Sequence, residues 1–313
     1  MSPYLYSLVL LSLVLIMLAY LKIAKLYKIF DIPNNRSSHV KPTIRGGGIL
    51  FPTAILLYAI VFNSWEPFFY ISLLMVSVVS FLDDLVSISS RLRFVVQFLS
   101  SICLIYAVFG MLSFQNILLL PFLIGAMNSY NFMDGINGIT AGYSLITIIS
   151  LLVANHYIGF VDYNLILILL LSTIVFTFFN FRKKAICFAG DVGSVSMAVI
   201  LLYLILKLIV FTSNPVFILF LVIYGLDTGL TLFERYKKKV NILEPHREHL
   251  YQKLVDNKGW SHLKVSSLAM VIQLCINFFV LYFISISSFK YSLSLSIILI
   301  LVICYKFVKN RFV

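Results

Sequence analysis

Charge is the scarcest property of this 313-residue sequence, because Asp, Glu, Lys and Arg make up only 12% of it. Soluble domains carry about 25% charged and about 45–50% apolar residues, whereas here 61% of the residues are hydrophobic. So little charge excludes an ordinary soluble enzyme and a disordered chain. The apolar runs are continuous and do not alternate with polar residues, which also excludes an outer-membrane β-barrel. The composition predicts an all-α, polytopic membrane protein.

Cysteine is sparse as well. The four cysteines lie inside apolar runs, without a CxxC pair or a cluster of His and Cys. This pattern argues against a disulfide framework and against a zinc site. The first apolar run, 4–21, has no basic segment before it and no cleavage site of small residues. It therefore predicts a retained span and not a signal peptide.

Long apolar runs are abundant. A helix needs about 20 apolar residues to cross a membrane, and the runs predict eleven spans with the N-terminus outside. Their approximate limits are 3–29, 47–63, 67–86, 92–111, 115–131, 135–154, 163–181, 193–212, 214–233, 266–287 and 290–308. The run 115–131 contains Pro121, which favours a short or tilted span. Residues 1–313 then form one membrane domain, with cytoplasmic loops at about 30–46, 86–93, 128–136, 181–192 and 234–265.

The net charge of +12, from 24 basic and 12 acidic residues, follows this topology. All basic residues except Lys207 and Lys290 fall on one side of the predicted membrane, and the positive-inside rule assigns that side to the cytoplasm. The charge is thus a topology signal, and nucleic acid is excluded as a partner. Among the acidic residues, only Glu66 and Asp162 fall on the outer side. The sequence therefore predicts that the chemistry lies at the cytoplasmic face.

The first long loop, 34–48, combines cations with glycines. It contains Lys41 and Arg45 and ends in three consecutive glycines at the start of a span. Glycine lets a backbone approach a ligand closely and helix N-termini attract anions, so one interpretation is a phosphate-binding corner. The other is a basic loop followed by small residues that pack against a helix. It is not a P-loop, because no Gly-Lys-Ser/Thr follows.

Two adjacent carboxylates, Asp83 and Asp84, end the third span. They oppose the helix dipole, repel each other and lie at a membrane edge where charge is costly. This unfavourable arrangement predicts a functional site, where a divalent cation or a phosphate-bearing substrate with its metal relieves the repulsion. The start of a solvated loop is the alternative.

Amide and carboxylate side chains recur at the end of the fifth span. Asn131, Asp134 and Asn137 are spaced by three residues, and they share one face if the segment is helical. Asparagines beside a carboxylate offer the paired donors and acceptors that suit a nucleobase or ribose. Two glycines, Gly135 and Gly138, equally suggest a plain turn between spans.

Three further polar residues lie near the ends of later spans. The seventh span ends at Asn180, and Asp191 follows in Phe188-Ala189-Gly190-Asp191. Asp191 stands just before an apolar run, as a helix N-cap should, and capping is compatible with metal binding. Oxygen ligands beside a phosphate suit Mg²⁺. Asp227 lies about two turns inside the ninth span, which predicts that it faces the bundle or a water-filled cleft.

The longest loop contains Pro245-His246-Arg247-Glu248-His249. Two histidines with an arginine suit a diphosphate, because arginine presents a planar fork and histidine donates or carries a proton. A zinc pair remains open, although no third strong ligand lies nearby. An amphipathic helix at the membrane surface is the other alternative.

These motifs occur in one order between residues 34 and 252. The features are Lys41-Pro42-Thr43 through Gly48, Asp83-Asp84, Asn131-Phe132-Met133-Asp134-Gly135 and Phe188-Ala189-Gly190-Asp191. With the histidine-containing loop, they resemble the polyprenyl-phosphate N-acetylhexosamine-1-phosphate transferases, or glycosyltransferase family 4. That family includes enzymes that start O-antigen, capsule and teichoic-acid lipid intermediates, and the phospho-MurNAc-pentapeptide translocase. The chain departs from many members in having Asn137 where they have an aspartate.

The resemblance implies a reaction. A membrane-bound undecaprenyl phosphate attacks the β-phosphate of a UDP-N-acetylhexosamine, UMP leaves, and a lipid-linked sugar diphosphate remains. The default sugar is GlcNAc, with QuiNAc and FucNAc as alternatives. The resemblance also implies Mg²⁺, with Mn²⁺ as a substitute, and a location in the bacterial or archaeal cytoplasmic membrane. It is compatible with a homodimer.

Residue roles follow from the resemblance by position. Asp83, Asp84, Asp134 and Asp191 would form the catalytic set, and Asp83, Asp84 and Asp191 would also be the metal ligands. The substrate-binding set would be Lys41, Arg45, Asn131, Asp134, Asn137, Asn180, Asp227, His246, Arg247 and His249. The competing classes are a secondary transporter or lipid flippase and a non-catalytic scaffold. Transporters place ionisable groups near the bilayer midplane, whereas here they gather at one face.

Overall fold

The computed structural model describes residues 3–33, 38–39, 41–241, 244, 246–284 and 290–312. Most of them are helical, as the composition predicted. The long helices are α1 (Pro3–Leu26), α2 (Leu50–Val61), α3 (Pro67–Leu85), α4 (Ser90–Phe109), α6 (Leu120–Met133), α7 (Ile139–Ile158), α8 (Tyr163–Asn180), α9 (Gly190–Thr212), α10 (Val222–Lys237), α12 (His262–Ile284) and α13 (Lys290–Phe312). The short elements are β1 (Phe30–Asp31), β2 (Thr43–Ile44), η1 (Gly47–Ile49), α5 (Phe114–Ile117), η2 (Pro215–Leu221) and α11 (Leu250–Asp256).

Eight helices in the described part of the chain are long and apolar enough to cross a membrane, with η2 and α10 together forming one of them. The stretch Gly47–Val61 is apolar but shorter. The run 115–131 is divided into α5 and α6, with Pro121 in the first turn of α6, where proline is tolerated. A polytopic membrane protein is therefore supported, whereas the number of eleven spans and their orientation stay predictions.

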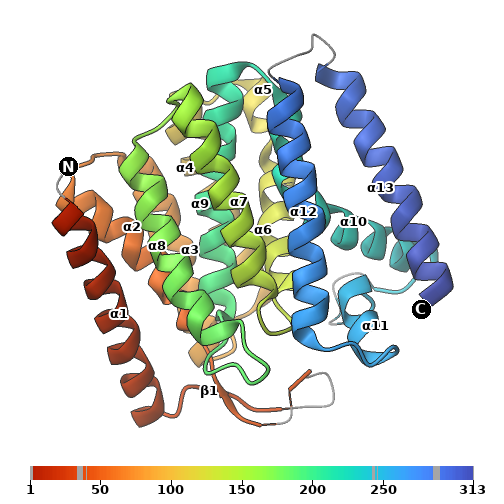
Figure 1. Cartoon of the computed structure of the whole chain (residues 1–313), viewed down its shortest axis with the longest axis horizontal. Helices are drawn as coiled ribbons and strands as arrows, with labels where there is room; N and C mark the ends of the chain where they lie inside the picture. The colour runs from red at the N-terminus through yellow and green to blue at the C-terminus, as the bar shows by residue number, and fades with distance from the viewer. Residues whose placement is uncertain are drawn as a thin grey trace.

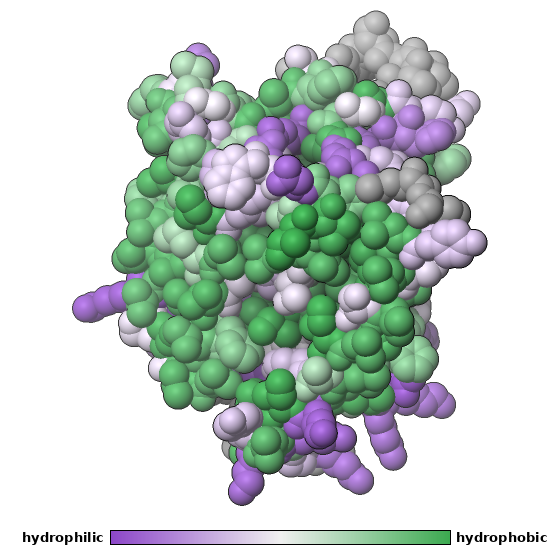
Figure 2. All heavy atoms as spheres, turned by 90° about the vertical axis from the view of Figure 1, so that its left-hand side faces the viewer, coloured by the Kyte–Doolittle hydropathy of each residue, from purple (hydrophilic) through white to green (hydrophobic). Residues whose placement is uncertain are grey.

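The helix α9 lies at the centre of the bundle, and Figure 1 shows the other helices around it. It packs against α2, α3, α4, α6 and α7, and almost every side chain from Gly190 to Leu208 is buried. A helix that is apolar on all sides is stable only when it is enclosed on all sides. The outer helices expose a broad apolar band, with hydrophilic side chains gathered above and below it (Figure 2).

The ends of several helices meet at one end of the bundle. There the C-termini of α3 and α6 lie against the N-terminus of α9. The strand β1 and the helix α11 lie at the same end, at the bottom of Figure 1. Polar residues from distant parts of the sequence therefore come together there.

The segment 128–138 is not one helix. The helix α6 ends at Met133, and α7 begins only after Gly138, whose φ of 83° is in the left-handed region that glycine adopts readily. Asn131, Asp134 and Asn137 were expected to share one face only if the segment were helical, and the structure shows the alternative, a turn between two helices. Asn131 lies in α6, Asp134 follows its last residue, and Asn137 lies in the turn before α7.

Candidate active site

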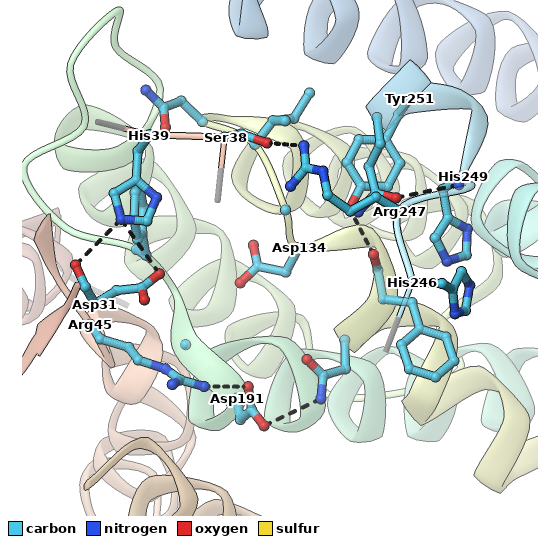
Figure 3. Close-up of a pocket in the computed structure, with 18 of the residues that line it drawn as sticks. Asp31, Ser38, His39, Arg45, Asp134, Asp191, His246, Arg247, His249 and Tyr251 are labelled. Atoms are coloured by element: carbon cyan, nitrogen blue, oxygen red, sulfur yellow. Dashed lines mark hydrogen bonds and ion pairs between the residues drawn. The ribbon is translucent and has the colours of Figure 1, made fainter. Parts of the chain in front are cut away.

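A pocket of about 610 Å³ lies where these helix ends meet (Figure 3). Its walls come from the β1–β2 region, the ends of α3, α6 and α9, and the segment before α11. Ten of the residues singled out in the sequence line it: Arg45, Asp83, Asn131, Asp134, Asn137, Asn180, Asp191, His246, Arg247 and His249. Its size is typical of sites for small-molecule ligands.

Asp84 is fully buried at the floor of this region and caps α9 from a different helix. Its two oxygens accept the backbone N–H groups of Asp191, at 2.9 Å, and of Val192, at 3.1 Å. The first N–H groups of a helix lack partners within it, and a carboxylate there also complements the helix dipole. The expectation that Asp191 caps this helix is therefore wrong, because the helix begins one residue earlier and Asp84 is the cap.

Asp191 is thereby left with its carboxylate directed into the pocket. Arg45 contacts it through Nη2 at 2.9 Å and reaches Asp84 through Nε at 2.5 Å. The Nη1 of Arg93 lies 3.5 Å from Asp191 and 3.0 Å from Asp83. Three carboxylates and two guanidinium groups thus alternate in one network. Burial opposes the charge on Arg45, but Asp84 and Asp191 outweigh that effect and raise the pKa of Arg45.

The glycines after Arg45 are explained by close packing of two backbones. The N–H of Gly47 donates to the carbonyl of Phe188 at 2.8 Å, and that of Gly48 to the carbonyl of Ala189 at 3.0 Å. A Cβ on Gly48 would lie 2.2 Å from the Cα of Gly193. The geometry favours the helix-packing interpretation of this loop. This packing holds Arg45 next to Asp84 and Asp191.

Lys41 lies apart from the pocket. Its side chain is exposed, and it is not among the described residues that line the cavity. Its neighbours 34–37 and 40, together with Pro245 in the later histidine segment, lie outside the described residues.

Asp134 follows the last turn of α6 and points into the middle of the pocket (Figure 3). Burial raises the pKa of its carboxyl to about 7, and the nearby charge of Asp191 acts in the same direction. One turn earlier, Asn131 donates from Nδ2 to Asp191 at 3.4 Å. The Asn-x-x-Asp motif therefore adjoins the acidic network and presents an amide and a carboxyl to the same cavity.

Asn137 and Asn180 line the pocket but use their amides on the backbone. Asn180 accepts from the N–H of Gly138 at 2.9 Å and donates to the carbonyl of Cys187 at 2.9 Å. Asn137 donates to the carbonyl of Arg182 at 2.9 Å. These bonds fix the α6–α7 and α8–α9 loops to each other. Direct contact of these two residues with a substrate stays a prediction.

The histidine segment forms the opposite wall. The rings of His246 and His249 stack with centroids 5.0 Å apart, and both lie beside Phe132. Burial lowers the pKa of His246, so that its neutral form is favoured. Arg247 pairs with both oxygens of Asp256, the shortest contact being 2.8 Å, and its Nη2 also donates to the hydroxyl of Ser38 at 2.7 Å (Figure 3).

Asp227 is buried behind this wall and does not line the cavity in the described part of the chain. Its oxygens accept the N–H groups of Leu250 at 2.9 Å and Tyr251 at 3.3 Å. It faces the interior of the bundle, as its depth in the span predicted. Contact between Asp227 and a substrate stays a prediction.

Comparison with known proteins agrees with the motifs. Residues 67–209 match the model of glycosyl transferase family 4. The chain is 28% identical to the probable undecaprenyl-phosphate N-acetylglucosaminyl 1-phosphate transferase of Bacillus subtilis, over 87% of this chain and 81% of the relative. It is also 27% identical to the phospho-N-acetylmuramoyl-pentapeptide-transferase of Petrotoga mobilis, over 70% of this chain and 77% of the relative.

A third relative matches a shorter stretch of the chain. The undecaprenyl-phosphate alpha-N-acetylglucosaminyl 1-phosphate transferase of Thermotoga maritima is 28% identical over 45% of this chain and 50% of its own length. The resemblance inferred from the motifs is confirmed at the level of the family.

The sequence motifs missed Arg93, which links two of the predicted acidic residues. Arg93 lies in the first turn after the start of α4, directly opposite Asp83 at the end of α3. A cation at a helix N-terminus opposes the helix dipole, as an aspartate does at a C-terminus. The same argument that identified Asp83 could therefore have identified Arg93. Asp31, His39 and His262 also line the pocket and carried no comparable signal.

The oxygen donors of this site fit a cation that needs few protein ligands. No group of three or more His, Cys, Asp and Glu side chains is arranged around a common point in the described residues. Mg²⁺ is usually held by one or two carboxylates together with water and substrate phosphates. Asp83 and Asp191, which share the Nη1 of Arg93, supply such a pair, whereas the buried Asp84 is used as a cap.

Proposed function

We propose that this protein transfers N-acetylhexosamine-1-phosphate from a UDP-amino sugar to undecaprenyl phosphate and releases UMP. The observation that carries the proposal is the network of Arg45, Arg93, Asp83 and Asp191 at the floor of the 610 Å³ pocket. Phosphoryl transfer requires positioned reactants and neutralised oxygen charge, which cations and metal-binding carboxylates supply. The names of the family-4 relatives support the same reaction.

In the proposed reaction, an oxygen of the lipid phosphate forms a bond to the β-phosphorus of the donor. The bond from that phosphorus to the bridging oxygen breaks, and the bridging oxygen leaves on UMP. A phosphate monoester has its second pKa near 6 and is mostly dianionic at pH 7. A general base is therefore not required. Direct attack and a covalent Asp-phosphate intermediate are both compatible with this arrangement.

Different side chains of the pocket would contact different parts of the two substrates. Arg45 and Arg93 would neutralise phosphate oxygens, while Asp83 and Asp191 would hold Mg²⁺, or Mn²⁺ in its place, which supplies further positive charge when bound. Asn131 and Asp134 offer the donors and acceptors that suit the uridine. The wall of His246 and Arg247 would contact the diphosphate or the sugar.

The default donor is UDP-GlcNAc, with UDP-QuiNAc and UDP-FucNAc as alternatives. The product would start a cell-surface polysaccharide, namely O-antigen, capsule or teichoic acid, at the cytoplasmic membrane of a bacterium. An active site at the ends of membrane-spanning helices is accessible to a lipid acceptor from the bilayer and to a nucleotide sugar from the aqueous side.

The deciding experiment measures UMP released by the purified protein from undecaprenyl phosphate and a panel of UDP-amino sugars, with and without Mg²⁺. We expect Asp191→Asn and Asp83→Asn to abolish release while the protein still inserts into membranes. Glu66→Gln, which removes a carboxylate at the opposite end of α3, is the matched control and should retain activity. Full activity in both Asp variants would contradict the proposal, and substrate transport without UMP release would favour the transporter alternative.

A further inference from the structure

The helix α13 carries two buried polar side chains at its C-terminal end. Tyr305 is 9% exposed and Lys309 is 7% exposed, although the helix is otherwise largely apolar. Burying a hydroxyl or an ammonium group in such surroundings is costly unless it has a partner. Both side chains have partners on α10. The Nζ of Lys309 lies 2.7 Å from an oxygen of Glu234, and the hydroxyl of Tyr305 donates to Asp227 at 3.0 Å.

Asp227 connects this pair of helices to the pocket wall. The oxygen that accepts from Tyr305 also accepts the N–H of Leu250, at 2.9 Å. The Nδ1 of His249 lies 3.5 Å from that same oxygen, and the second oxygen accepts the N–H of Tyr251 at 3.3 Å. Asp227 therefore caps α11 from another helix, just as Asp84 caps α9.

The capped end of α11 is part of the pocket. His249 and Tyr251 line the cavity, and the Tyr251 hydroxyl donates to the carbonyl of Phe132 at 2.8 Å. His246 stacks on His249. Asp227 therefore helps to set the position of the wall from His246 to Tyr251, together with the capping box that His249 and Gln252 form at the same helix end. Figure 1 shows α13 reaching the end of the molecule where α10 and α11 lie.

We propose that Tyr305 is a positioning residue for the donor side of the pocket, acting through Asp227 on the segment His246–Tyr251. Tyr305 donates to the same oxygen of Asp227 that accepts from the N–H of Leu250, so its hydroxyl helps the carboxylate keep the orientation that α11 requires. The charged pair of Lys309 and Glu234 holds α13 in register with α10. The inference lies outside the family-4 region 67–209. It rests on the proposed function only for the identity of the donor.

The variant Tyr305→Phe removes the hydroxyl and keeps the ring. We expect the KM for the UDP-sugar to rise about fivefold, the equivalent of one net hydrogen bond, with the KM for undecaprenyl phosphate unchanged. Asp83 and Arg93, which would hold the metal and neutralise phosphate oxygens, form their ion pairs with each other and with Asp191 and not with α11 in the described residues. Tyr157→Phe is the matched control, because Tyr157 is 82% exposed, and we expect it to behave as the wild type.

A second measurement needs no substrate. Hydrogen–deuterium exchange of the amides of Leu250 and Tyr251 should be faster in Tyr305→Phe than in the wild type and unchanged in Tyr157→Phe. Unchanged exchange with unchanged KM would overturn the proposal, and so would an equal rise of both KM values, which indicates general loss of structure. A wild-type protein that releases no UMP would refute the proposed function, while the exchange experiment would still test the positioning role.

Discussion

Arg45 joins two carboxylates that belong to different helices. Its Nε lies 2.5 Å from Asp84, the cap of α9, and its Nη2 lies 2.9 Å from Asp191, which faces the pocket. A guanidinium group makes such a double contact because its donors project in a fixed fork, whereas an ammonium group is a point charge. The charge and the shape of Arg45 therefore contribute separately to the site.

The variant Arg45→Lys separates these two contributions. It keeps the positive charge but loses one of the two contacts, so Asp191 or Asp84 has one charged partner fewer. A buried charged hydrogen bond is worth about 1.5–3 kcal/mol, and we expect UMP release to fall by roughly 10- to 100-fold. Arg91→Lys is the matched control, since Arg91 is exposed near the start of α4. Equal activity in the two variants would show that the fork of Arg45 is dispensable.

The buried carboxyl of Asp134 predicts a dependence of stability on pH. Burial raises its pKa from the usual 3.8 to about 7. Between these values the folded protein binds a proton that the unfolded chain has lost. The free energy of unfolding therefore decreases as pH rises from about 4 to 7, and the full loss is present above the folded pKa.

Asp134→Asn removes this ionisation. We expect its melting temperature in detergent to exceed that of the wild type at pH 8 and to equal it at pH 4. The corresponding gain in the free energy of unfolding at pH 8 is at most about 4 kcal/mol. Thermal unfolding monitored by fluorescence at both pH values measures the difference. Glu66→Gln serves as the control carboxylate at the opposite end of the bundle. A gain for Asp134→Asn of the same size at pH 4 and pH 8 would refute the assignment.

At the scale of helices, the apolar runs predicted where most elements lie but not how their ends are stabilised. Each predicted span has a helical counterpart in the described residues, because the period and length of an apolar run are local properties. Asp84 accepts from the first N–H groups of α9 and Asp227 from those of α11, where His249 and Gln252 also form a local capping box. Both carboxylates lie more than 20 residues away in sequence from the helix they stabilise. A local search for a cap instead selects Asp191. The sequence therefore identified the acidic residues, while the fold was needed to distinguish caps from pocket residues.

The contact between η1 and α9 gives an element-scale prediction. A Cβ on Gly48 would lie 2.2 Å from the Cα of Gly193, so that Gly48→Ala forces the two backbones apart. Overpacking of this kind costs about 1–3 kcal/mol. We expect a lower melting temperature and, because Arg45 precedes this contact, reduced UMP release.

The matched control for this substitution is Gly125→Ala. Gly125 lies within α6, and a Cβ added there would meet no atom of a neighbouring element within 4 Å in the described residues. Alanine is also a better helix former than glycine. We expect this variant to be as stable as the wild type or more stable. Similar destabilisation by both alanines would mean that the close approach of η1 and α9 is not the cause.

At the scale of the whole molecule, separate sequence motifs meet because helix ends converge at one end of the bundle. Arg45, Asp83, Asn131 and Asp191 come from four distant segments and share one pocket. The sequence predicted that these four residues belong to the site and in which order they occur. It did not predict the distances between them, because those depend on how the helices pack. The arrangement agrees with the predicted topology, in which the acidic motifs and nearly all basic residues lie on one side of the membrane.

This topology predicts which end of the bundle faces the cytoplasm. Trp65, at the end opposite the pocket, is 81% exposed, and Lys258 is exposed near α11. In intact bacterial cells, a membrane-impermeant maleimide should label Trp65→Cys and not Lys258→Cys, and both should react once the membrane is permeabilised. The wild-type protein, which keeps its four native cysteines, measures the background. Labelling of Lys258→Cys alone in intact cells would place the pocket outside, where nucleotide sugars are absent, and would contradict both the orientation and the proposed donor.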